Sequence, residues 1–145
     1  MISSVIKEDY PYFIRIWENV VKETYDFFEE EDFVFYKKYR MPYYFNHLYF
    51  FSYRDEKGKI KGFLGVSKEK VEMLFIDNTA RRQGIGKRFM NFAINNLKIT
   101  KVDVNEYNRD AISFFNHLGF KVIGRSKFDK EGKNYPILYL EKSVS

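Results

Sequence analysis

Arginine, glutamine and glycine stand together in the segment Arg81-Arg82-Gln83-Gly84-Ile85-Gly86-Lys87. Glycine lets the backbone approach a ligand closely and adopt conformations closed to other residues. An apolar run ends just before this segment, and an amphipathic helical pattern begins inside it. The start of a helix presents unpaired N–H groups and the positive end of the helix dipole, so the segment predicts a phosphate site. The cationic side chains of Arg81, Arg82 and Lys87 complement a pyrophosphate.

Two common phosphate-binding motifs do not fit this segment. The pattern G-x-x-x-x-G-K-[ST] is absent, and the dinucleotide fingerprint requires a third glycine. A Gly-x-Gly pair alone arises by chance about once in a chain of this size. On the motif alone, a basic turn whose glycine serves helix packing is an equal alternative.

The spacing of apolar residues predicts the elements that hold this loop. Residues 2–6 read as a short strand, and residues 13–28 place apolar side chains three and four apart, which is typical of an amphipathic helix. Pro11 falls in the first turn of that helix. A second helix is expected through residues 33–39, ending before Pro42.

The rest of the chain begins with three strands joined by short turns, which predict an antiparallel meander. These strands are expected at 48–53, 60–67 and 71–76. After them we expect a helix at 85–97, a strand at 102–104, a helix at 108–118 ended by Gly119, and strands at 122–123 and 135–140. This order predicts one mixed α/β (α+β) domain over residues 1–145, with a sheet of about seven strands and about four helices.

Composition sets the class of protein. The chain has 145 residues, of which 45% are hydrophobic, and this excludes a disordered chain. The chain has no cysteine, which argues against a disulfide framework. Its two histidines have no cysteine beside them, which argues against a zinc site. No apolar run is long enough to cross a bilayer, and no signal peptide is visible, so we expect a cytoplasmic protein without membrane contact. The net charge of +5 is spread along the chain without a basic arm for nucleic acid.

A second motif gives the phosphate loop its context. The run Asn108-Arg109-Asp110-Ala111-Ile112-Ser113-Phe114-Phe115-Asn116-His117-Leu118-Gly119-Phe120 resembles N-x-x-A-x-x-F-Y-x-x-x-G-F, and Arg81 to Gly86 resembles [QR]-x-x-G-x-[GA]. Both are motifs of the GNAT (GCN5-related N-acetyltransferase) family, in the family's order. Nearly the whole chain resembles a small, single-domain bacterial member. The resemblance implies the GNAT fold, with a mostly antiparallel mixed sheet splayed into a V between strands 4 and 5.

The resemblance also implies acetyl-CoA as cosubstrate, with no metal. Pantetheine would bond to the main chain of one strand edge, the pyrophosphate to the loop amides, and the cofactor arm to Asn108, which is also a natural helix N-cap. The cofactor-binding residues expected on this basis are Leu74, Phe75, Ile76, Arg81, Arg82, Gln83, Gly84, Ile85, Gly86, Lys87, Asn108 and Phe115.

One position departs from the family pattern. The resemblance implies direct attack of an amine on the thioester, with a tyrosine as acid, but that position holds Phe115. Three alternatives follow: another tyrosine acts, with Tyr135 as first candidate; the thiolate leaves unassisted, since a thiol pKa near 8.5 is tolerable near neutral pH; or the protein binds acyl-CoA with little turnover.

Two carboxylates are candidates for the base. Glu72 is an acidic residue within an apolar strand, and Asp103 lies on the following strand, where some family members place a catalytic acid. For each of them, a solvated or salt-bridged role in the strand is favoured over the role of base. His47, at the start of a strand, and His117, in a last helical turn, are expected to be structural.

The favoured function is an acetyl-CoA-dependent N-acetyltransferase acting on a primary amine, and the alternative is a non-catalytic acyl-CoA-binding module. A nucleic-acid-binding protein is a third reading, which strong salt dependence would reveal. Small amines, amino acids, antibiotics and protein amines all stay open as acceptors. The acidic run 29–32 is weakly indicative of a cationic acceptor, and a solvated acidic helix start or loop is the favoured explanation of it. Both a monomer and a homodimer are compatible with the sequence.

Overall fold

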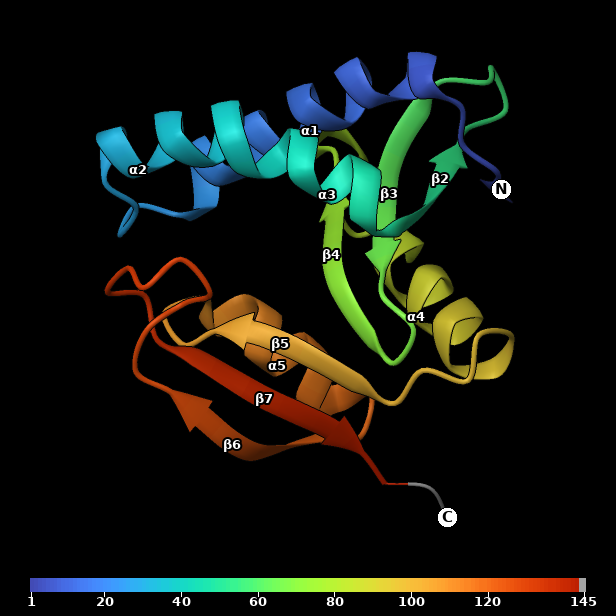
Figure 1. The fold of residues 1–145 in the computed structure, drawn as a ribbon. Coiled ribbons are helices and arrows are strands. Elements are labelled where there is room, and N and C mark those ends of the chain that lie inside the picture. Colours follow the sequence, from blue (N-terminus) through green and yellow to red (C-terminus); the bar gives the residue numbers. More distant parts are fainter. Residues whose placement is uncertain (144–145) are drawn as a thin grey trace.

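A seven-stranded sheet with helices on both faces makes up the computed structural model, which describes residues 1–143 (Figure 1). The strands are β1 (Ile2–Ser3), β2 (Tyr49–Arg54), β3 (Ile60–Val66), β4 (Lys70–Ile76), β5 (Lys101–Asn105), β6 (Phe120–Ser126) and β7 (Ile137–Lys142). The helices are α1 (Tyr10–Thr24), α2 (Glu30–Phe35), α3 (Met41–His47), α4 (Ile85–Asn95) and α5 (Arg109–His117). A π turn (Tyr36–Arg40) joins α2 to α3.

The strands lie in the order β1-β2-β3-β4-β5-β7-β6. All neighbouring pairs are antiparallel except β4 with β5, which are parallel. The predicted meander is therefore confirmed as β2-β3-β4, and the mixed, mostly antiparallel sheet is confirmed with it. The parallel pair marks the place where the meander meets the second half of the sheet.

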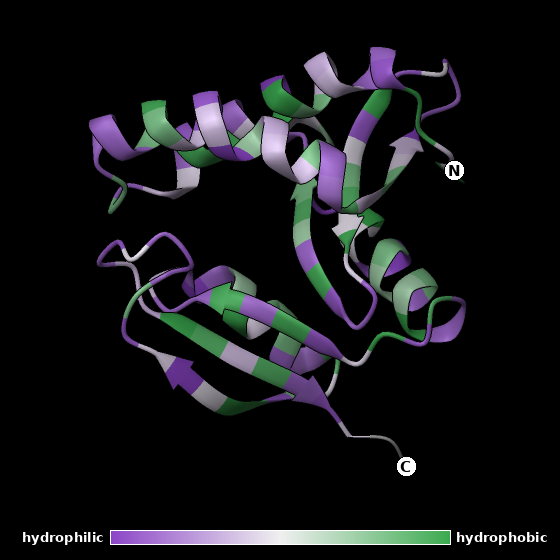
Figure 2. Cartoon of the chain, in the orientation of Figure 1, coloured by the Kyte–Doolittle hydropathy of each residue, from purple (hydrophilic) through white to green (hydrophobic). Residues whose placement is uncertain are grey.

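Two hydrophobic cores cover opposite faces of the sheet. One lies under α4 and α5 and contains Phe89, Met90 and Phe120, and the other lies under α1 and contains Phe13 and Phe63. The helices bury one face each because their apolar residues recur at helical spacing. Figure 2 shows this pattern on α4, and hydrophobic residues alternate with hydrophilic ones along β5. Each core fixes one wall of the space between β4 and β5.

The predicted end of the second helix was wrong. The helical path does not stop before Pro42; it continues through the π turn, and Pro42 lies in the first turn of α3. In the π turn the Met41 N–H donates to the Tyr36 carbonyl, and the first turn of a helix tolerates a residue without an N–H. His47 accordingly ends α3 rather than beginning a strand. The last strand begins at Ile137, so Tyr135 lies in the preceding loop.

Two features are absent from residues 1–143. None of the helices there is both long enough and apolar enough to span a membrane. No group of three or more His, Cys, Asp or Glu side chains in that part of the chain is arranged to hold a metal ion.

Gly119 ends α5 with a φ of +93°, a conformation that favours glycine. A Cβ added there would lie 2.8 Å from Lys142 Nζ, which donates a hydrogen bond to the Leu118 carbonyl. We expect Gly119→Ala to lower the free energy of unfolding by about 1–2 kcal/mol, measured by urea denaturation. Gly58→Ala is the control, because Gly58 has a φ of +80° and nothing near an added Cβ. A smaller cost at Gly119 than at Gly58 would contradict the role given to the Lys142 contact.

Candidate active site

The strands β4 and β5 pair at only two positions and then part. Lys70 pairs with Lys101 and Val71 with Val102, whereas β4 stays paired with β3 as far as Ile76. The edge of β4 that β5 leaves free lines a cleft of about 790 Å³, here called the V cleft. Leu74, Phe75 and Ile76, expected from the sequence at this edge, all line it.

Glu72 lies at the point where the strands separate, in a β-bulge. Met73 pairs with Gly65 and Val71 with Val66, so Glu72 is an extra residue without a partner on β3. Val71 and Leu74 both pack on the core beneath α4, although they are three residues apart. Strict alternation would place Glu72 with Leu74, inside that core. The bulge instead turns the carboxylate out of the core, a use of bulges that is common beside active sites.

The predicted phosphate loop forms one end of the V cleft. Gly84 adopts a φ of +77° and caps α4, whose first helical bond runs from Arg88 N to the Gly84 carbonyl. The N–H groups of Ile85 to Lys87 therefore have no acceptor within the helix. Arg82, with a φ of +63°, is one of two non-glycine residues at positive φ in the described chain.

The side chains of the loop divide between two surfaces. Arg81, Arg82 and Gly86 line the V cleft, whereas Gln83 and Ile85 line a shallower depression near β2 and the N-terminus. The side chains of Gln83 and Ile85 therefore do not line the V cleft, and only their backbone atoms could contact a ligand there. A Cβ added at Gly86 would lie 3.3 Å from the Phe114 ring, so this glycine lets α4 and α5 approach closely.

The opposite wall of the V cleft brings together Asn108 and Tyr25. The Asn108 side chain accepts a hydrogen bond from Ala111 N at 3.2 Å, which confirms the N-cap. Its amide also donates to the Tyr25 hydroxyl at 3.2 Å. Phe115 lines the same cleft and packs against Phe120.

Tyr25 is a candidate acid that the sequence analysis missed. Within residues 1–143 its hydroxyl accepts from Asn108 and donates to no protein atom, so its proton is available. Burial raises the pKa of Tyr25, and the Asn108 hydrogen bond only partly opposes this, so the hydroxyl is protonated at neutral pH. No sequence signal marks the residue, because its contact with Asn108 joins segments 83 positions apart.

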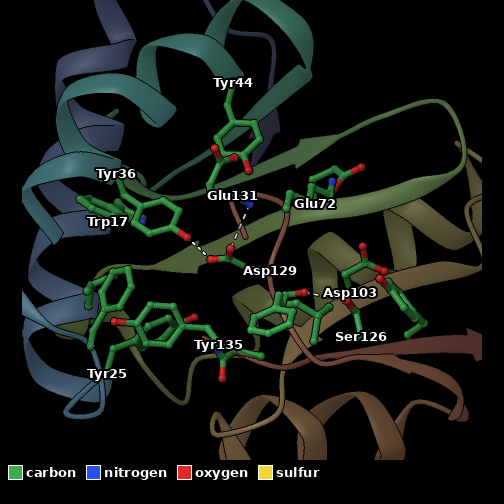
Figure 3. Close-up of a pocket in the computed structure, with 17 residues that line it drawn as sticks. Trp17, Tyr25, Tyr36, Tyr44, Glu72, Asp103, Ser126, Asp129, Glu131 and Tyr135 are labelled. Carbon is green, nitrogen blue, oxygen red and sulfur yellow. Dashed lines mark hydrogen bonds and ion pairs between the residues drawn. The ribbon is translucent and has the colours of Figure 1, made fainter. Parts of the chain in front are cut away.

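A second hollow of about 310 Å³, here called the aromatic pocket, adjoins the V cleft (Figure 3). Its aromatic walls are Trp17, Tyr25, Phe28, Tyr36, Tyr44, Phe128, Tyr135 and Tyr139. Four carboxylates also line it, those of Glu72, Asp103, Asp129 and Glu131. Tyr25, Glu72, Asp103 and Asn105 border both hollows, so the two meet where β4 and β5 separate. The structure thus brings both predicted base candidates to this junction.

Each base candidate is paired with a lysine. Glu72 Oε1 lies 2.8 Å from Lys130 Nζ, and Glu72 Oε2 accepts a hydrogen bond from the Ser67 hydroxyl at 2.9 Å. Asp103 Oδ2 lies 3.0 Å from Lys70 Nζ. Lys70 belongs to β4 beside Asp103, whereas Lys130 reaches Glu72 from a distant loop.

That loop, residues 127–136 between β6 and β7, is fastened to the α2 region and rises toward α2 in Figure 1. The Tyr36 hydroxyl donates to Asp129, as Figure 3 shows. Arg40 pairs with Glu131 at 2.7 Å, and Lys133 pairs with Asp32 at 2.8 Å. These contacts close one side of the aromatic pocket.

Tyr135 takes part in the same fastening. Its hydroxyl donates to Asp32 and accepts from the Glu29 N–H at 3.0 Å. Burial, followed by the bond to Asp32, raises the pKa of Tyr135 to about 12. Tyr135 lines the aromatic pocket but is not among the residues of the V cleft, so its role as acid stays a prediction. The acidic run 29–32 supplies Asp32 to this contact rather than forming only a solvated helix start.

The pairing of Asp32 predicts a pH-dependent contribution to stability. Hydrogen bonds from Lys133 and Tyr135 lower the pKa of Asp32 below its ordinary value of 3.8. A lowered folded-state pKa stabilises the protein above the unfolded-state value, and this stabilisation is lost as pH falls through the folded-state pKa. We expect Asp32→Asn to cost about 1–2 kcal/mol of unfolding free energy near neutral pH. The cost should shrink below about pH 4.

Denaturant titrations at several pH values would measure this cost. Glu30→Gln, a change in the same acidic run, is the matched control and should show little pH dependence. A cost for Asp32→Asn that is the same at acidic and neutral pH would show that the ionised carboxylate is not what stabilises the loop.

Comparison with known proteins agrees with this geometry. A family model described as an acetyltransferase (GNAT) domain matches residues 22–135. Over 79 residues the chain is 43% identical to the peptidyl-lysine N-acetyltransferase YjaB of Salmonella typhimurium, covering 54% of each sequence. It is 37% identical over 86 residues to the protein of the same name from Escherichia coli, covering 59% of this chain and 58% of that one. The chain spans just over half the length of these curated relatives in both matches.

Solved structures share the fold over almost the entire chain. The solution structure of apo-form YjaB from Escherichia coli superposes with a TM-score of 0.90 at 28% identity, covering 100% of this chain and 98% of that one. The PaiA N-acetyltransferase of Thermoplasma acidophilum, in complex with coenzyme A, gives a TM-score of 0.77 at 20% identity, covering 99% and 98%. At that identity, the second likeness concerns the fold alone.

Proposed function

The chain belongs to the GNAT acetyltransferase family, and from that premise we propose that it transfers an acetyl group from acetyl-CoA to the side-chain amine of a lysine in a peptide or protein. The observation that carries the proposal is the separation of β4 from β5 at Glu72, where the V cleft and the aromatic pocket meet. One hollow suits the acyl donor and the other suits the amine. The printed names of the two relatives, peptidyl-lysine N-acetyltransferases, support the choice of acceptor.

The V cleft fits acetyl-CoA in shape and charge. An extended pantetheine arm can bond to the free edge of β4 in the way that a peptide adds to a sheet edge. The free N–H groups at the start of α4 suit a pyrophosphate. Arg82 lines the V cleft and Lys87 lies in the first turn of α4. Both are exposed and form no ion pair within residues 1–143, so their charge is available to phosphate.

The aromatic pocket fits an ammonium group. Aromatic faces attract cations, and the carboxylates that line the pocket add opposite charge. In the proposed reaction, Glu72 takes one proton from the ammonium, and the neutral amine attacks the carbonyl carbon of the thioester. The N–C bond forms, the C–S bond breaks, and the CoA thiolate leaves with a proton from Tyr25. The nitrogen loses its second proton as the amide forms, and that proton returns to Tyr25, while the proton on Glu72 passes to solvent. A main-chain N–H on the free edge of β4 stabilises the oxyanion.

A second function rests on one specific observation, the presence of Phe115 at the usual acid position. A protein that binds acyl-CoA without turnover would keep the V cleft and the phosphate loop but need no acid. Such a module and the enzyme bind acetyl-CoA alike, so only a turnover measurement separates them.

Calorimetric titration with acetyl-CoA tests the proposal first. The double change Arg82→Glu/Lys87→Glu should weaken binding by at least about tenfold, because it replaces two cations at the phosphate site by anions. Lys57→Glu/Lys59→Glu, in the turn between β2 and β3, is the control, because it alters the net charge equally away from the V cleft. Failure of the unmodified protein to bind acetyl-CoA would overturn the proposal.

The second step is an assay for free thiol with lysine-containing peptides. Release of CoA that depends on the peptide supports the enzyme. Tight binding of acetyl-CoA without release, over a broad set of amines, would favour the binding module.

A further inference from the structure

Lys130 is placed as an acceptor amine would be. Its Nζ lies 2.8 Å from Glu72 Oε1, at the junction of the V cleft and the aromatic pocket. The Glu72 side chain is 12% exposed and the Lys130 side chain 55% exposed, so the lysine enters from the surface and ends at a nearly buried carboxylate. An external lysine that used Glu72 as its base would have to bring its amine to the same oxygen.

The other lysines of the same loop do not reach this point. Lys127 lies over the Phe128 ring at 5.7 Å, and Lys133 pairs with Asp32. Lys130 therefore differs from two close neighbours of the same chemistry. Comparing the three lysines therefore tests whether modification depends on the position of Lys130 or occurs at any surface lysine.

The loop holds Lys130 in place through its backbone. Asp129, the preceding residue, accepts hydrogen bonds from the N–H groups of Glu131 and Lys133, each at 2.9 Å. Asp129 also accepts from the Tyr36 hydroxyl. A nucleophile fixed beside its base reacts as though it were present at very high concentration, which favours an intramolecular reaction.

We propose that Lys130 is an acetylation site of this protein itself, modified by its own active site. The inference rests on the proposed function, because acetyl-CoA must occupy the V cleft. Glu72 takes a proton from the Lys130 ammonium, and Nζ attacks the thioester carbonyl carbon. The N–C bond forms as the C–S bond breaks. Nζ loses its second proton as the amide forms, one proton is taken up by the CoA thiolate, and the proton on Glu72 passes to solvent. The products are Nε-acetyl-Lys130 and CoA.

Acetylation would also change the pocket. The acetylated amine carries no charge, so the ion pair with Glu72 is lost and Glu72 becomes free to receive an external ammonium. The modification thus removes a resident cation from the place where the acceptor must bind. We expect the unmodified protein to acetylate a peptide with an initial lag that preincubation with acetyl-CoA abolishes.

Intact-mass measurement and peptide mapping test the proposal on the full chain, incubated with acetyl-CoA and no other amine. We expect one acetyl group per chain at Lys130, and its loss in Lys130→Arg. Lys127→Arg and Lys133→Arg are matched controls and should keep the modification. Glu72→Gln should abolish it, which separates the reaction from direct chemical acetylation of surface lysines. The rate constant should not change when the protein is diluted about tenfold, as expected for a unimolecular step.

Several outcomes overturn the inference. Equal labelling of Lys127, Lys130 and Lys133 would show chemical acetylation, and a rate that falls on dilution would show modification of one molecule by another. A protein that acetylates an external lysine peptide but leaves Lys130 unmodified overturns this inference and leaves the proposed function standing. A protein that acetylates neither, while binding acetyl-CoA, overturns both.

Discussion

Glu72→Gln should lower kcat for a lysine peptide about a hundredfold, at the lower end of what a positioned base contributes. The affinity for acetyl-CoA should stay within about twofold, because glutamine keeps the shape of the side chain and the V cleft is lined by many other groups. The structural reason is the bulge, which brings this carboxylate out of the core to the point where both hollows meet. Initial rates of CoA release and calorimetry measure the two quantities.

Asp103→Asn is the matched comparison. Asp103 borders the same two hollows, but its partner Lys70 lies beside it in the sheet, whereas the partner of Glu72 belongs to the loop between β6 and β7. An incoming ammonium can displace a lysine that comes from a loop more easily than one fixed on a neighbouring strand. We therefore expect Asp103→Asn to cost less than Glu72→Gln. The reverse order would assign the base to Asp103, and a small effect of both would indicate proton transfer to water.

The elements that the sequence predicted well are those whose signals are local. Apolar runs separated by short turns located the three strands of the meander, and Asn108 with Gly119 bounded α5 within one residue at each end. Gly84, which has a φ of +77°, marked the start of α4 for the same reason, because glycine adopts a positive φ without steric cost. Such features depend on neighbours along the chain, and a single sequence contains them.

The features that the sequence did not predict depend on contacts between distant segments. Pro42 suggested a helix end, but the π turn before it let the helical path continue. The apolar residues around Glu72 gave no sign of a bulge, which arises from the register of β4 against β3. The hydrogen bond between Tyr25 and Asn108 and the ion pair between Lys130 and Glu72 likewise join residues far apart in the chain. These contacts decide which residues meet at the candidate active site.

Tyr25→Phe should lower kcat about tenfold to a hundredfold and leave the affinity for acetyl-CoA nearly unchanged. The lower part of that range is expected because a thiol of pKa near 8.5 leaves tolerably without an acid. Tyr135→Phe should instead act mainly on KM for the peptide. The Tyr135 hydroxyl holds the loop beside the aromatic pocket through its hydrogen bonds to Asp32 and Glu29. Its proton is already donated to Asp32.

The variant Asn108→Ser distinguishes between two roles of the Tyr25 hydroxyl: that of an acid and that of a structural hydrogen-bond partner of Asn108. Serine still caps α5 but lacks the amide that donates to the Tyr25 hydroxyl. If Tyr25 supplies the proton, Asn108→Ser should retain most of kcat, because the hydroxyl remains. If the hydroxyl matters only by holding Asn108, both variants should lose the same fraction of kcat and weaken acetyl-CoA binding together. A Tyr135→Phe variant with the larger loss of kcat would return the acid to Tyr135, and full activity of both tyrosine variants would mean that the thiolate leaves unassisted.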